Sequence, residues 1–258
     1  DAVTAEAAVR AIKVTYEELP AVFDAEKSMQ PGAPSIHEVE NNVAAHFKIE
    51  RGDVEKALAS ADVVVDETFE SMLQWQSALE MHGALADFHP SGKITIWSCL
   101  SGTYRARLQI AKAMGMDPGQ IRIIQTAVGG GFGGKSMDDN NAVITALLAK
   151  AARRPAQLIN SREYDFIAGR PRPNIRIRVR AGFMSDGTMV AKDLRLVTNN
   201  GAYSGKAPAV GGVAALRNDT LYLNDCVRAE LFVPYTNQVP TGAFRGFGNP
   251  SAEWAVEQ

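Results

Sequence analysis

The sequence alternates strictly between apolar and basic residues at Ile175-Arg176-Ile177-Arg178-Val179-Arg180, and this stretch decides the fold class. A period of two is typical of a β-strand with one buried face. Residues 182–190 follow, and Asp186-Gly187 within them predicts the turn of a β-hairpin. We interpret the arginines as the solvated face of a half-buried sheet rather than a nucleic-acid stripe, because no aromatic residues interleave with them.

Other stretches predict a mixture of strands and helices around this hairpin. Strands are expected at residues 11–16, 61–69, 84–88, 94–98 and 121–124, and helices at 3–10, 52–58, 103–114, 138–152 and 252–258. Thr4 is expected to cap the first helix, and the proline-containing stretch 24–46 to form an irregular connection. The irregular order of elements favours an α+β fold, with mixed sheets and packed helices, over a doubly wound sheet.

The composition bounds the class of protein. Hydrophobic residues make up 46% and charged residues 22% of the 258 residues, which is typical of a globular chain with one large domain or two smaller ones. A net charge of −2 favours neither a nucleic-acid binder nor a basic membrane-surface protein. Without a spanning apolar run or a signal-peptide pattern, we expect a cytoplasmic protein in which Cys99 and Cys226 are buried thiols.

The stretch from Gly129 to Lys135 reads Gly-Gly-Gly-Phe-Gly-Gly-Lys and lies between a predicted strand and a predicted helix. Five glycines within six positions let backbone N–H groups approach a ligand closely, and a helix beginning near Asp138 would add its positive end. We interpret this stretch, called the glycine loop below, as a backbone cradle for an anion. The alternative is a tight turn that needs positive φ angles.

The same stretch also satisfies the phosphate-loop pattern G-x-x-x-x-G-K-[ST], ending at Lys135-Ser136. Nucleotide binding is therefore a rival hypothesis. Against it, the later apolar strand at 194–197 ends in Thr198-Asn199, without the magnesium-binding Asp of such proteins. The loop also lies in the middle of the chain, whereas phosphate loops commonly follow the first strand.

A second motif, Ala243-Phe244-Arg245-Gly246-Phe247-Gly248, is called the aromatic loop below. On its own it could be an arginine on a loop packed by two aromatic rings. Together with the glycine loop, it resembles the xanthine dehydrogenase and aldehyde oxidase family of molybdenum hydroxylases, in which a G-G-F-G-G loop and an A-F-R-G-F/Y-G loop line the molybdopterin. Further similar motifs, in the family's order, are Leu79-Glu80-Met81-His82-Gly83-Ala84, Thr95-Ile96-Trp97-Ser98, Ser161-Arg162-Glu163 and Asn199-Asn200-Gly201-Ala202-Tyr203.

The resemblance implies an enzyme that hydroxylates an aldehyde or N-heterocycle with a water-derived oxygen. Electrons would pass to Fe-S clusters, and usually FAD, on other domains or subunits of a multi-subunit complex; no cysteine cluster here suits Fe-S. It divides the chain into an N-terminal segment and linker (1–50) and the amino-terminal half of the molybdopterin-binding region (51–258). Because Asp1 replaces an initiator Met and residues 252–258 read as a cut helix, we expect a fragment that is inactive when isolated, or a non-catalytic scaffold.

The resemblance also implies the residues of the site. The dithiolene of the pterin holds the metal, so no protein ligand to it is expected. The cofactor-binding residues implied are Gly130, Gly131, Phe132, Gly133, Gly134, Ser101, Phe244, Arg245 and Gly246, and the substrate would contact Phe247 and Ser136.

Some of these positions depart from the family pattern. Ser101 stands where many members carry Gln, Ser136 where purine-oxidising members carry Glu, and Val213 near where those members carry an arginine. Xanthine is thus no safer a substrate than an aldehyde. The general base, a Glu in a G-x-G-E motif, is missing before Gln258, so no catalytic residue is assigned. Glu80 and Glu163 are expected in structural pairs, and His82 as a packed or hydrogen-bonded residue.

Overall fold

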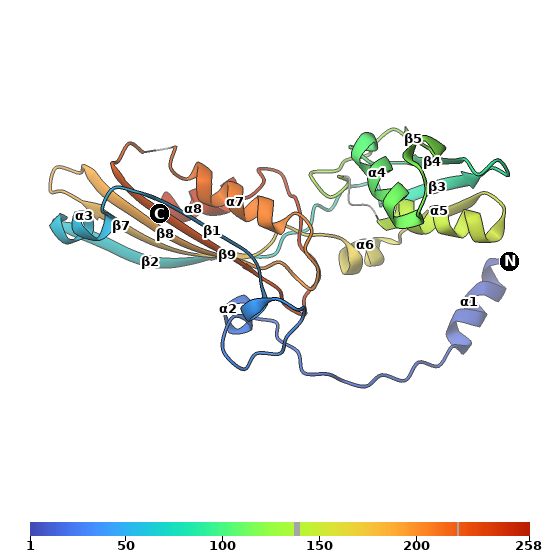
Figure 1. The fold of residues 1–258 in the computed structure, drawn as a ribbon, viewed down its shortest axis with the longest axis horizontal. Coiled ribbons are helices and arrows are strands. Elements are labelled where there is room, and N and C mark those ends of the chain that lie inside the picture. The colour runs from blue at the N-terminus through green and yellow to red at the C-terminus, as the bar shows by residue number, and fades with distance from the viewer. Residues whose placement is uncertain (137–139, 221) are drawn as a thin grey trace.

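The computed structural model describes residues 1–136, 140–220 and 222–258, in which two β-sheets form two lobes side by side (Figure 1). The larger lobe contains β1 (Val43–Arg51), β2 (Val63–Ser71), β7 (Ile175–Phe183), β8 (Met189–Thr198) and β9 (Cys226–Pro234), with α3 (Val54–Ser60), α7 (Ala207–Arg217) and α8 (Asn249–Val256). The smaller lobe contains β3 (Gly83–Phe88), β4 (Ile94–Ser98), β5 (Ile121–Gln125) and β6 (Ala156–Ile159), with α4 (Thr103–Met114), η2 (Pro118–Gln120) and α5 (Asn140–Ala152). Two chain crossings join the lobes, and α6 (Arg162–Ala168) lies on the second.

The five-stranded sheet of the larger lobe has the order β1-β9-β8-β7-β2. Its β8–β9 pair is parallel and the other three pairs are antiparallel. Alternation gives β7 one buried face, on which Ile175, Ile177 and Val179 pack beneath α7 and α8. The predicted hairpin is confirmed, because β7 and β8 pair in antiparallel register across Asp186-Gly187.

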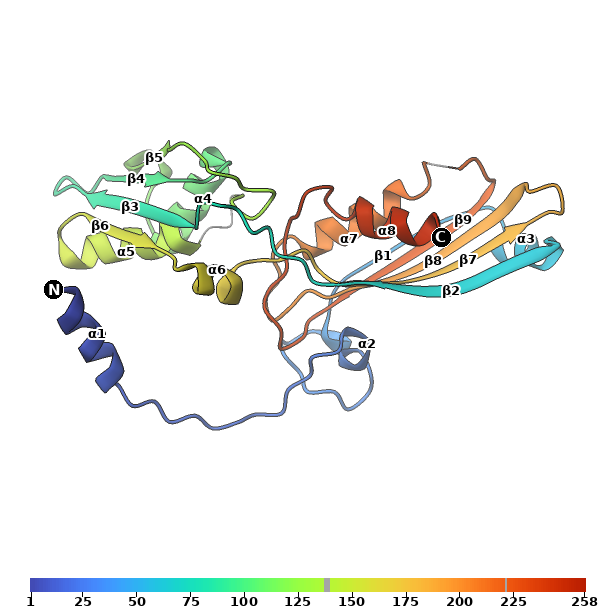
Figure 2. The ribbon, with the colours of Figure 1, turned by 180° about the vertical axis from the view of Figure 1, so that it is seen from behind.

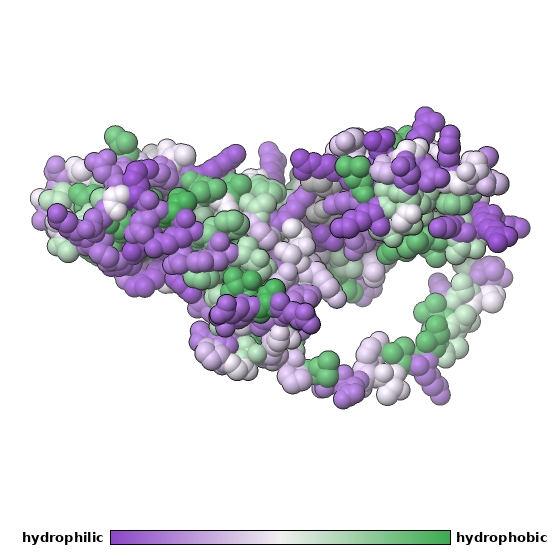
Figure 3. Space-filling view, in the orientation of Figure 1, coloured by the Kyte–Doolittle hydropathy of each residue, from purple (hydrophilic) through white to green (hydrophobic). Residues whose placement is uncertain are grey.

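The opposite face of this sheet carries the arginines in ion pairs. Arg178 donates two hydrogen bonds to the Asp66 carboxylate, at 2.7 and 2.6 Å, and Arg228 donates to Asp193 at 2.8 and 2.6 Å. The hydrophilic colouring of this lobe in Figure 3 agrees with the predicted solvated face. Cross-strand pairs of opposite charge thus neutralise the part of this sheet face that α3 does not cover.

The four-stranded sheet of the smaller lobe has the order β5-β4-β3-β6, with α4 and α5 packed on one face. Helix α4 buries Ala106, Ile110, Ala111 and Met114 against this sheet. It ends at Gly115, whose φ of 62° is the left-handed conformation that glycine adopts without strain. The α+β prediction is confirmed, with mixed pairing in both sheets. Among the described residues, no helix is long and apolar enough to cross a membrane.

The N-terminal region differs from the predictions. Helix α1 (Ala2–Ala11) is capped by the Asp1 carboxylate, which accepts from the Thr4 N–H, so Thr4 is not the cap. The strand predicted at 11–16 is absent: the residues after α1 form an exposed arm that pairs with no strand of the described chain (Figure 2). An alternating pattern favours a strand, but a strand forms only beside a partner.

Other elements lay outside the sequence predictions. The stretch 24–46 contains α2 (Ala25–Ser28), η1 (Glu40–Asn42) and the start of β1, so it is not a fully irregular connection. The elements β6, α6, α7 and β9 were not predicted. Helix α5 is described from Asn140 onward, and its predicted start at Asp138 lies outside the described residues.

Candidate cofactor site

The glycine loop and the aromatic loop lie against each other, although more than a hundred residues separate them in the chain. Gly133, at φ 105°, approaches so closely that a Cβ added to it would lie 2.5 Å from the Ala243 oxygen. The Arg245 N–H donates to the Phe132 oxygen at 2.9 Å. The structure therefore brings the two predicted motifs into one site, where the smaller lobe meets the larger.

The glycine loop presents a run of unpaired backbone donors. Within the described residues, the N–H groups of Gly130, Gly131, Phe132 and Gly133 donate no hydrogen bond. Phe132 itself has a φ of 50°, between glycines 130 and 133 at 93° and 105°. Successive amides in such turns form a concave surface that suits an anion or another hydrogen-bond acceptor. This donor set fits the acceptor-rich pterin and phosphate groups of a molybdopterin.

Glu80 joins the two ends of the glycine loop through one oxygen. Its Oε2 accepts from the Gly129 N–H at 2.8 Å and from the Lys135 Nζ at 2.5 Å. The hydrogen bond from Lys135 lowers the pKa of the Glu80 carboxyl, with the Gly129 bond acting in the same direction. The Lys135 side chain is only 1% exposed. The lysine of a phosphate loop contacts the phosphates of a nucleotide, whereas the Lys135 ammonium is buried and paired with Glu80. This position disfavours the nucleotide-binding alternative.

Two further side chains fix the carboxyl end of the glycine loop. Ser101 bonds the Lys135 oxygen with both its backbone N–H, at 2.9 Å, and its hydroxyl, at 3.0 Å. The His82 ring lies between the Gly134 oxygen, 3.1 Å from Nε2, and Asp165, 3.2 Å from Nδ1. The expected hydrogen-bonded role of His82 is confirmed, and so is the pairing of Glu80. Glu163 is exposed and has no partner among the described residues, so that prediction was wrong.

The aromatic loop is supported by two residues that the sequence did not single out. The Gln76 amide donates to the Ala243 oxygen at 2.7 Å and to the Arg170 oxygen at 2.8 Å. The Arg172 guanidinium donates to the Arg245 oxygen at 2.6 Å and lies 4.3 Å from the centre of the Phe244 ring. Burial lowers the pKa of Arg172. Hydrogen bonds between residues 73 to 167 positions apart leave no periodic signal, so no local pattern could have found them.

The remaining predicted residues lie around the meeting point of the loops. Arg245 is exposed, and its side chain makes no hydrogen bond or ion pair with the part of the chain that the structure describes. Phe247 is half-buried with a φ of 50°, and the Ser136 hydroxyl accepts from Lys206 Nζ at 2.6 Å. Arg245, whose backbone N–H is bonded to the Phe132 oxygen, thus adds a positively charged residue to the junction of the loops, which suits a ligand with negative charge.

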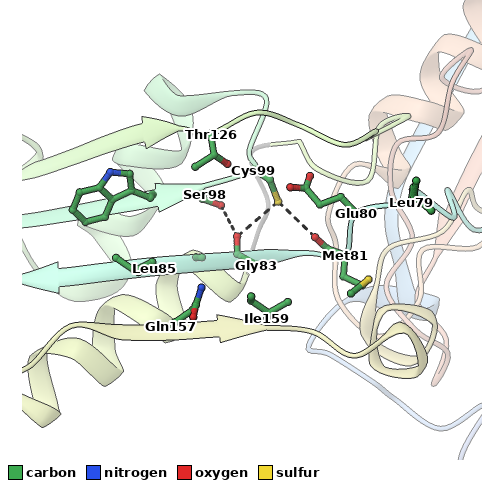
Figure 4. Close-up of a pocket in the computed structure, with 12 residues that line it drawn as sticks. Leu79, Glu80, Met81, Gly83, Leu85, Ser98, Cys99, Thr126, Gln157 and Ile159 are labelled. Atoms are coloured by element: carbon green, nitrogen blue, oxygen red, sulfur yellow. Dashed lines mark hydrogen bonds between the residues drawn. The ribbon is translucent and has the colours of Figure 1, made fainter.

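A cavity of about 420 Å³ lies on the uncovered face of the smaller sheet, beside Glu80 (Figure 4). Leu85, Trp97 and Ile159 give it an apolar lining. Cys99 lines it, with its Sγ 3.8 Å from the Met81 oxygen. Both cysteines are free as expected, but only Cys99 is buried; Cys226 is partly exposed, so its predicted burial was wrong. Among the described residues, no group of three His, Cys, Asp or Glu side chains could hold a metal ion.

Comparison with known proteins shows the family of this chain. Residues 36–258 match the family described as the molybdopterin cofactor-binding domain. A probable xanthine dehydrogenase subunit from Bacillus subtilis is 31% identical over 98% of the chain, and the nicotinate dehydrogenase large molybdopterin subunit of Eubacterium barkeri is 30% identical over 95%. The chain spans 34% of the first relative's length and 57% of the second's.

Solved structures show the same fold. The aldehyde oxidoreductase of Desulfovibrio gigas superposes with a TM-score of 0.87 and 27% identity, covering all of this chain and 29% of that one. Quinoline 2-oxidoreductase of Pseudomonas putida superposes with a TM-score of 0.88 and 26% identity, covering 95% of this chain and 32% of that one. The fold is that of a molybdopterin-binding domain. The chain belongs to the xanthine dehydrogenase and aldehyde oxidase family of molybdenum hydroxylases.

Proposed function

We propose that this chain is the molybdopterin-binding portion of an oxidoreductase that hydroxylates an aldehyde or N-heterocycle with a water-derived oxygen. The observation that carries the proposal is the contact between the glycine loop and the aromatic loop, which places the unpaired amides of residues 130–133 beside Arg245. When bound, the molybdenum cofactor would supply the two-electron redox centre, which protein side chains alone lack.

Within this site, we assign the N–H groups of residues 130–133 as donors to the cofactor and Arg245 as its positive charge. Phe244, Gly246 and Gly134 support the backbone of the two loops. The Ser101 hydroxyl already donates to the Lys135 oxygen, so Ser101 orients the loop and leaves only its lone pairs for a ligand. Phe247 and Ser136 stand as the residues nearest to a planar substrate.

The relatives support the substrate class but not a single substrate. Their names include xanthine, nicotinate and quinoline, which are N-heterocycles, and aldehydes. Ser136 is engaged by Lys206, and its hydroxyl is a weaker and shorter partner for a purine than a carboxylate. We therefore propose that the substrate is an aldehyde, a less polar ring or a purine, with no preference for the purine.

The full reaction requires more than this chain. We propose that the general base and the rest of the molybdenum region lie beyond residue 258, and that Fe-S and FAD centres on other domains or subunits take the electrons. The division between a segment at 1–50 and a cofactor-binding region at 51–258 stays a prediction.

The test is the cofactor content of the Arg245→Ala variant. Because the Arg245 side chain is exposed and makes no hydrogen bond or ion pair with the described chain, its removal should leave folding unchanged. A charge-assisted hydrogen bond contributes about 1.5–3 kcal/mol, so molybdenum and pterin retained after purification should fall about tenfold or more. Arg105, exposed on α4 of the smaller lobe, provides the matched control as Arg105→Ala.

Cells that make the cofactor are needed for this measurement. Wild-type protein from such cells, free of molybdenum and pterin, would refute the proposal. Equal cofactor content in wild type and Arg245→Ala would show that Arg245 does not bind the cofactor. The amides of the glycine loop would then remain as the proposed cofactor-binding groups.

A further inference from the structure

Two phenylalanines at the junction of the loops have an unusual backbone conformation. Six non-glycine residues of the described chain have a positive φ, and two of them are Phe132 and Phe247, each at 50°. Each is flanked by glycines that also have a positive φ, at positions 130 and 133 and at positions 246 and 248. An L side chain disfavours this left-handed region, because its Cβ approaches the carbonyl oxygen that follows. Each loop therefore carries one strained aromatic residue.

The core of the protein does not use these two rings. Within the described chain, neither belongs to a hydrophobic core cluster and neither pairs with another aromatic ring. Phe132 is 48% exposed, and Phe247 is half-buried. Phe244 differs from both, because its φ is not positive and its ring lies against the Arg172 guanidinium. Strained residues that fill no core cluster at ligand-binding sites.

The positions of the two phenylalanines are linked through the contact between the loops. The Arg245 N–H donates to the Phe132 oxygen at 2.9 Å, and Phe247 follows two residues after Arg245. The Phe132 ring lies over Gly130, because a Cβ added to Gly130 would be 3.1 Å from its Cε2. The ring thus covers the start of the run of unpaired amides and is still open to solvent.

We propose that the Phe132 ring contacts the substrate and, together with Phe247, selects a planar aromatic molecule. Aromatic rings attract each other in offset-stacked and edge-to-face arrangements, which a saturated ring cannot form equally well. The substrate class is then an aromatic aldehyde or an aromatic N-heterocycle rather than an aliphatic aldehyde. The role in catalysis rests on the proposed function, whereas the binding of an aromatic ring at Phe132 does not.

The first measurement tests whether the fold needs the ring, by urea denaturation of Phe132→Gly. Glycine adopts a positive φ without a steric cost, so the urea midpoint should not fall. Arg153→Gly is the matched control, since Arg153 is exposed and has a φ of 52° in the turn between α5 and β6. Its midpoint should change in the same way. A clear fall in Phe132→Gly alone would show that the ring stabilises the fold, which would overturn the proposal.

The second measurement is an NMR titration of the chain without cofactor, with labelled phenylalanine rings. The two probes are benzamide and cyclohexanecarboxamide, which share a carboxamide and a six-membered ring but differ in flatness. Benzamide should bind at Phe132 with a Kd about two- to tenfold lower than that of cyclohexanecarboxamide. Phe132→Leu should lose this preference and Phe132→Tyr should keep it. Equal Kd values in wild type, or no binding at Phe132, would overturn the proposal.

The third measurement is the kinetics of the assembled, cofactor-loaded enzyme with benzaldehyde and cyclohexanecarbaldehyde, with rates expressed per bound molybdenum. In Phe132→Leu the ratio of kcat/KM for benzaldehyde to that for cyclohexanecarbaldehyde should fall about two- to tenfold, mainly through KM. Phe132→Tyr and Arg153→Gly should keep the wild-type ratio.

The outcomes separate this inference from the proposed function. A wild-type ratio in Phe132→Leu would overturn the substrate role of the ring. An enzyme that oxidises no aldehyde or aromatic N-heterocycle, but whose chain binds benzamide at Phe132, would refute the proposed function and leave the aromatic contact standing.

Discussion

The glycine loop and the aromatic loop meet at one site, but the chain holds them in different ways. The glycine loop is held by charged and polar side chains: Glu80 and Lys135 at its two ends, and His82 at Gly134. The aromatic loop is held by close packing in addition to the hydrogen bonds from Gln76 and Arg172. A Cβ on Gly246 would lie 2.3 Å from Pro250, and one on Gly248 would lie 2.2 Å from the Val210 oxygen.

This difference follows from the helix or strand to which each loop is joined in the chain. The aromatic loop leads directly into α8, which is packed on the larger sheet, so its shape is fixed by a buried helix. The glycine loop follows β5 and leaves the N–H groups of residues 130–133 without a partner among the described residues, while the Gly134 N–H donates to the Gly131 oxygen within the loop. A loop that offers its own hydrogen bonds to a ligand must be stabilised from outside. The glycine loop should therefore respond to changes of charge, and the aromatic loop to changes of volume.

The largest effect is expected where the two loops touch, in Gly133→Ala. The new methyl group would lie 2.5 Å from the Ala243 oxygen at a φ of 105°, which combines a clash with backbone strain. We expect the free energy of unfolding to fall by roughly 2–4 kcal/mol and cofactor retention to be lost. Urea denaturation and molybdenum analysis measure the two effects.

The control for this variant is Gly212→Ala in α7, where an added Cβ meets nothing within 4 Å. It should raise the free energy of unfolding by about 0.5–1 kcal/mol, because alanine favours the helix interior. If Gly133→Ala were as stable as wild type and kept its cofactor, the loops would not form one packed unit.

Charge should matter next, in Glu80→Gln. The change leaves the Lys135 ammonium buried without its carboxylate, a cost that we put at roughly 2 kcal/mol, since Glu80 is 37% exposed and partly screened. In Glu80→Gln with Lys135→Met, most of this loss should be recovered, because no buried charge is then left unpaired. Urea denaturation of the two variants measures the difference, and a double variant weaker than Glu80→Gln alone would contradict the pairing.

The pH dependence of this pair has a defined sign. The pKa of Glu80 is lowered in the folded chain, chiefly by the hydrogen bond from Lys135. The stabilisation is therefore complete above the unfolded value of about 4.3 and is lost as the pH falls through the folded value. Glu80→Gln should flatten the stability profile on the acid side of that value.

The aromatic loop should show a smaller effect without pH dependence, in Arg172→Ala. The variant loses the bond to the Arg245 oxygen and the stacking on Phe244, for about 1–2 kcal/mol. Because a guanidinium stays charged at all accessible pH values, the loss should be equal at pH values of about 5 and 8. Arg105→Ala, on the exposed face of α4, should leave the urea midpoint unchanged. A loss confined to one pH would make the aromatic loop charge-dependent too.

The sequence predicted those helices and strands in which apolar residues repeat at regular intervals. The β7–β8 hairpin and α4 were predicted because alternation and an apolar helix face are written in neighbouring residues. Helix α7 was missed because glycines 211 and 212 weaken the helical pattern, and β6 because four residues carry no period. The arm at 12–23 shows the converse error, an alternating pattern without a partner strand in the described chain.

The site divides in the same way. Its two loops were found because their glycines and aromatic residues are contiguous. Because both loops resemble motifs of one family, they were predicted to form one cofactor site. The residues that support the aromatic loop, Gln76 and Arg172, act over long sequence separations through hydrogen bonds and a ring contact. Their residue types are ordinary, and only the fold places them beside the loops.

The smallest expected effect concerns the charged face of the larger lobe, whose ion pairs include no residue of either loop. Hydrogen bonds from Arg228 and Arg180 lower the pKa of Glu55 to about 2, from an ordinary value of 4.5. Its stabilising contribution should be complete above about pH 4.5 and be lost as the pH falls toward 2. Glu55→Gln should therefore raise the pH midpoint of acid unfolding slightly and leave neutral-pH cofactor retention unchanged.

Glu67→Gln, at an exposed position of β2 on the same lobe, should leave the midpoint unchanged, as followed by circular dichroism. If Glu55→Gln lowered cofactor retention at neutral pH, the charged face would be coupled to the site, and stabilisation by charge would extend beyond the glycine loop.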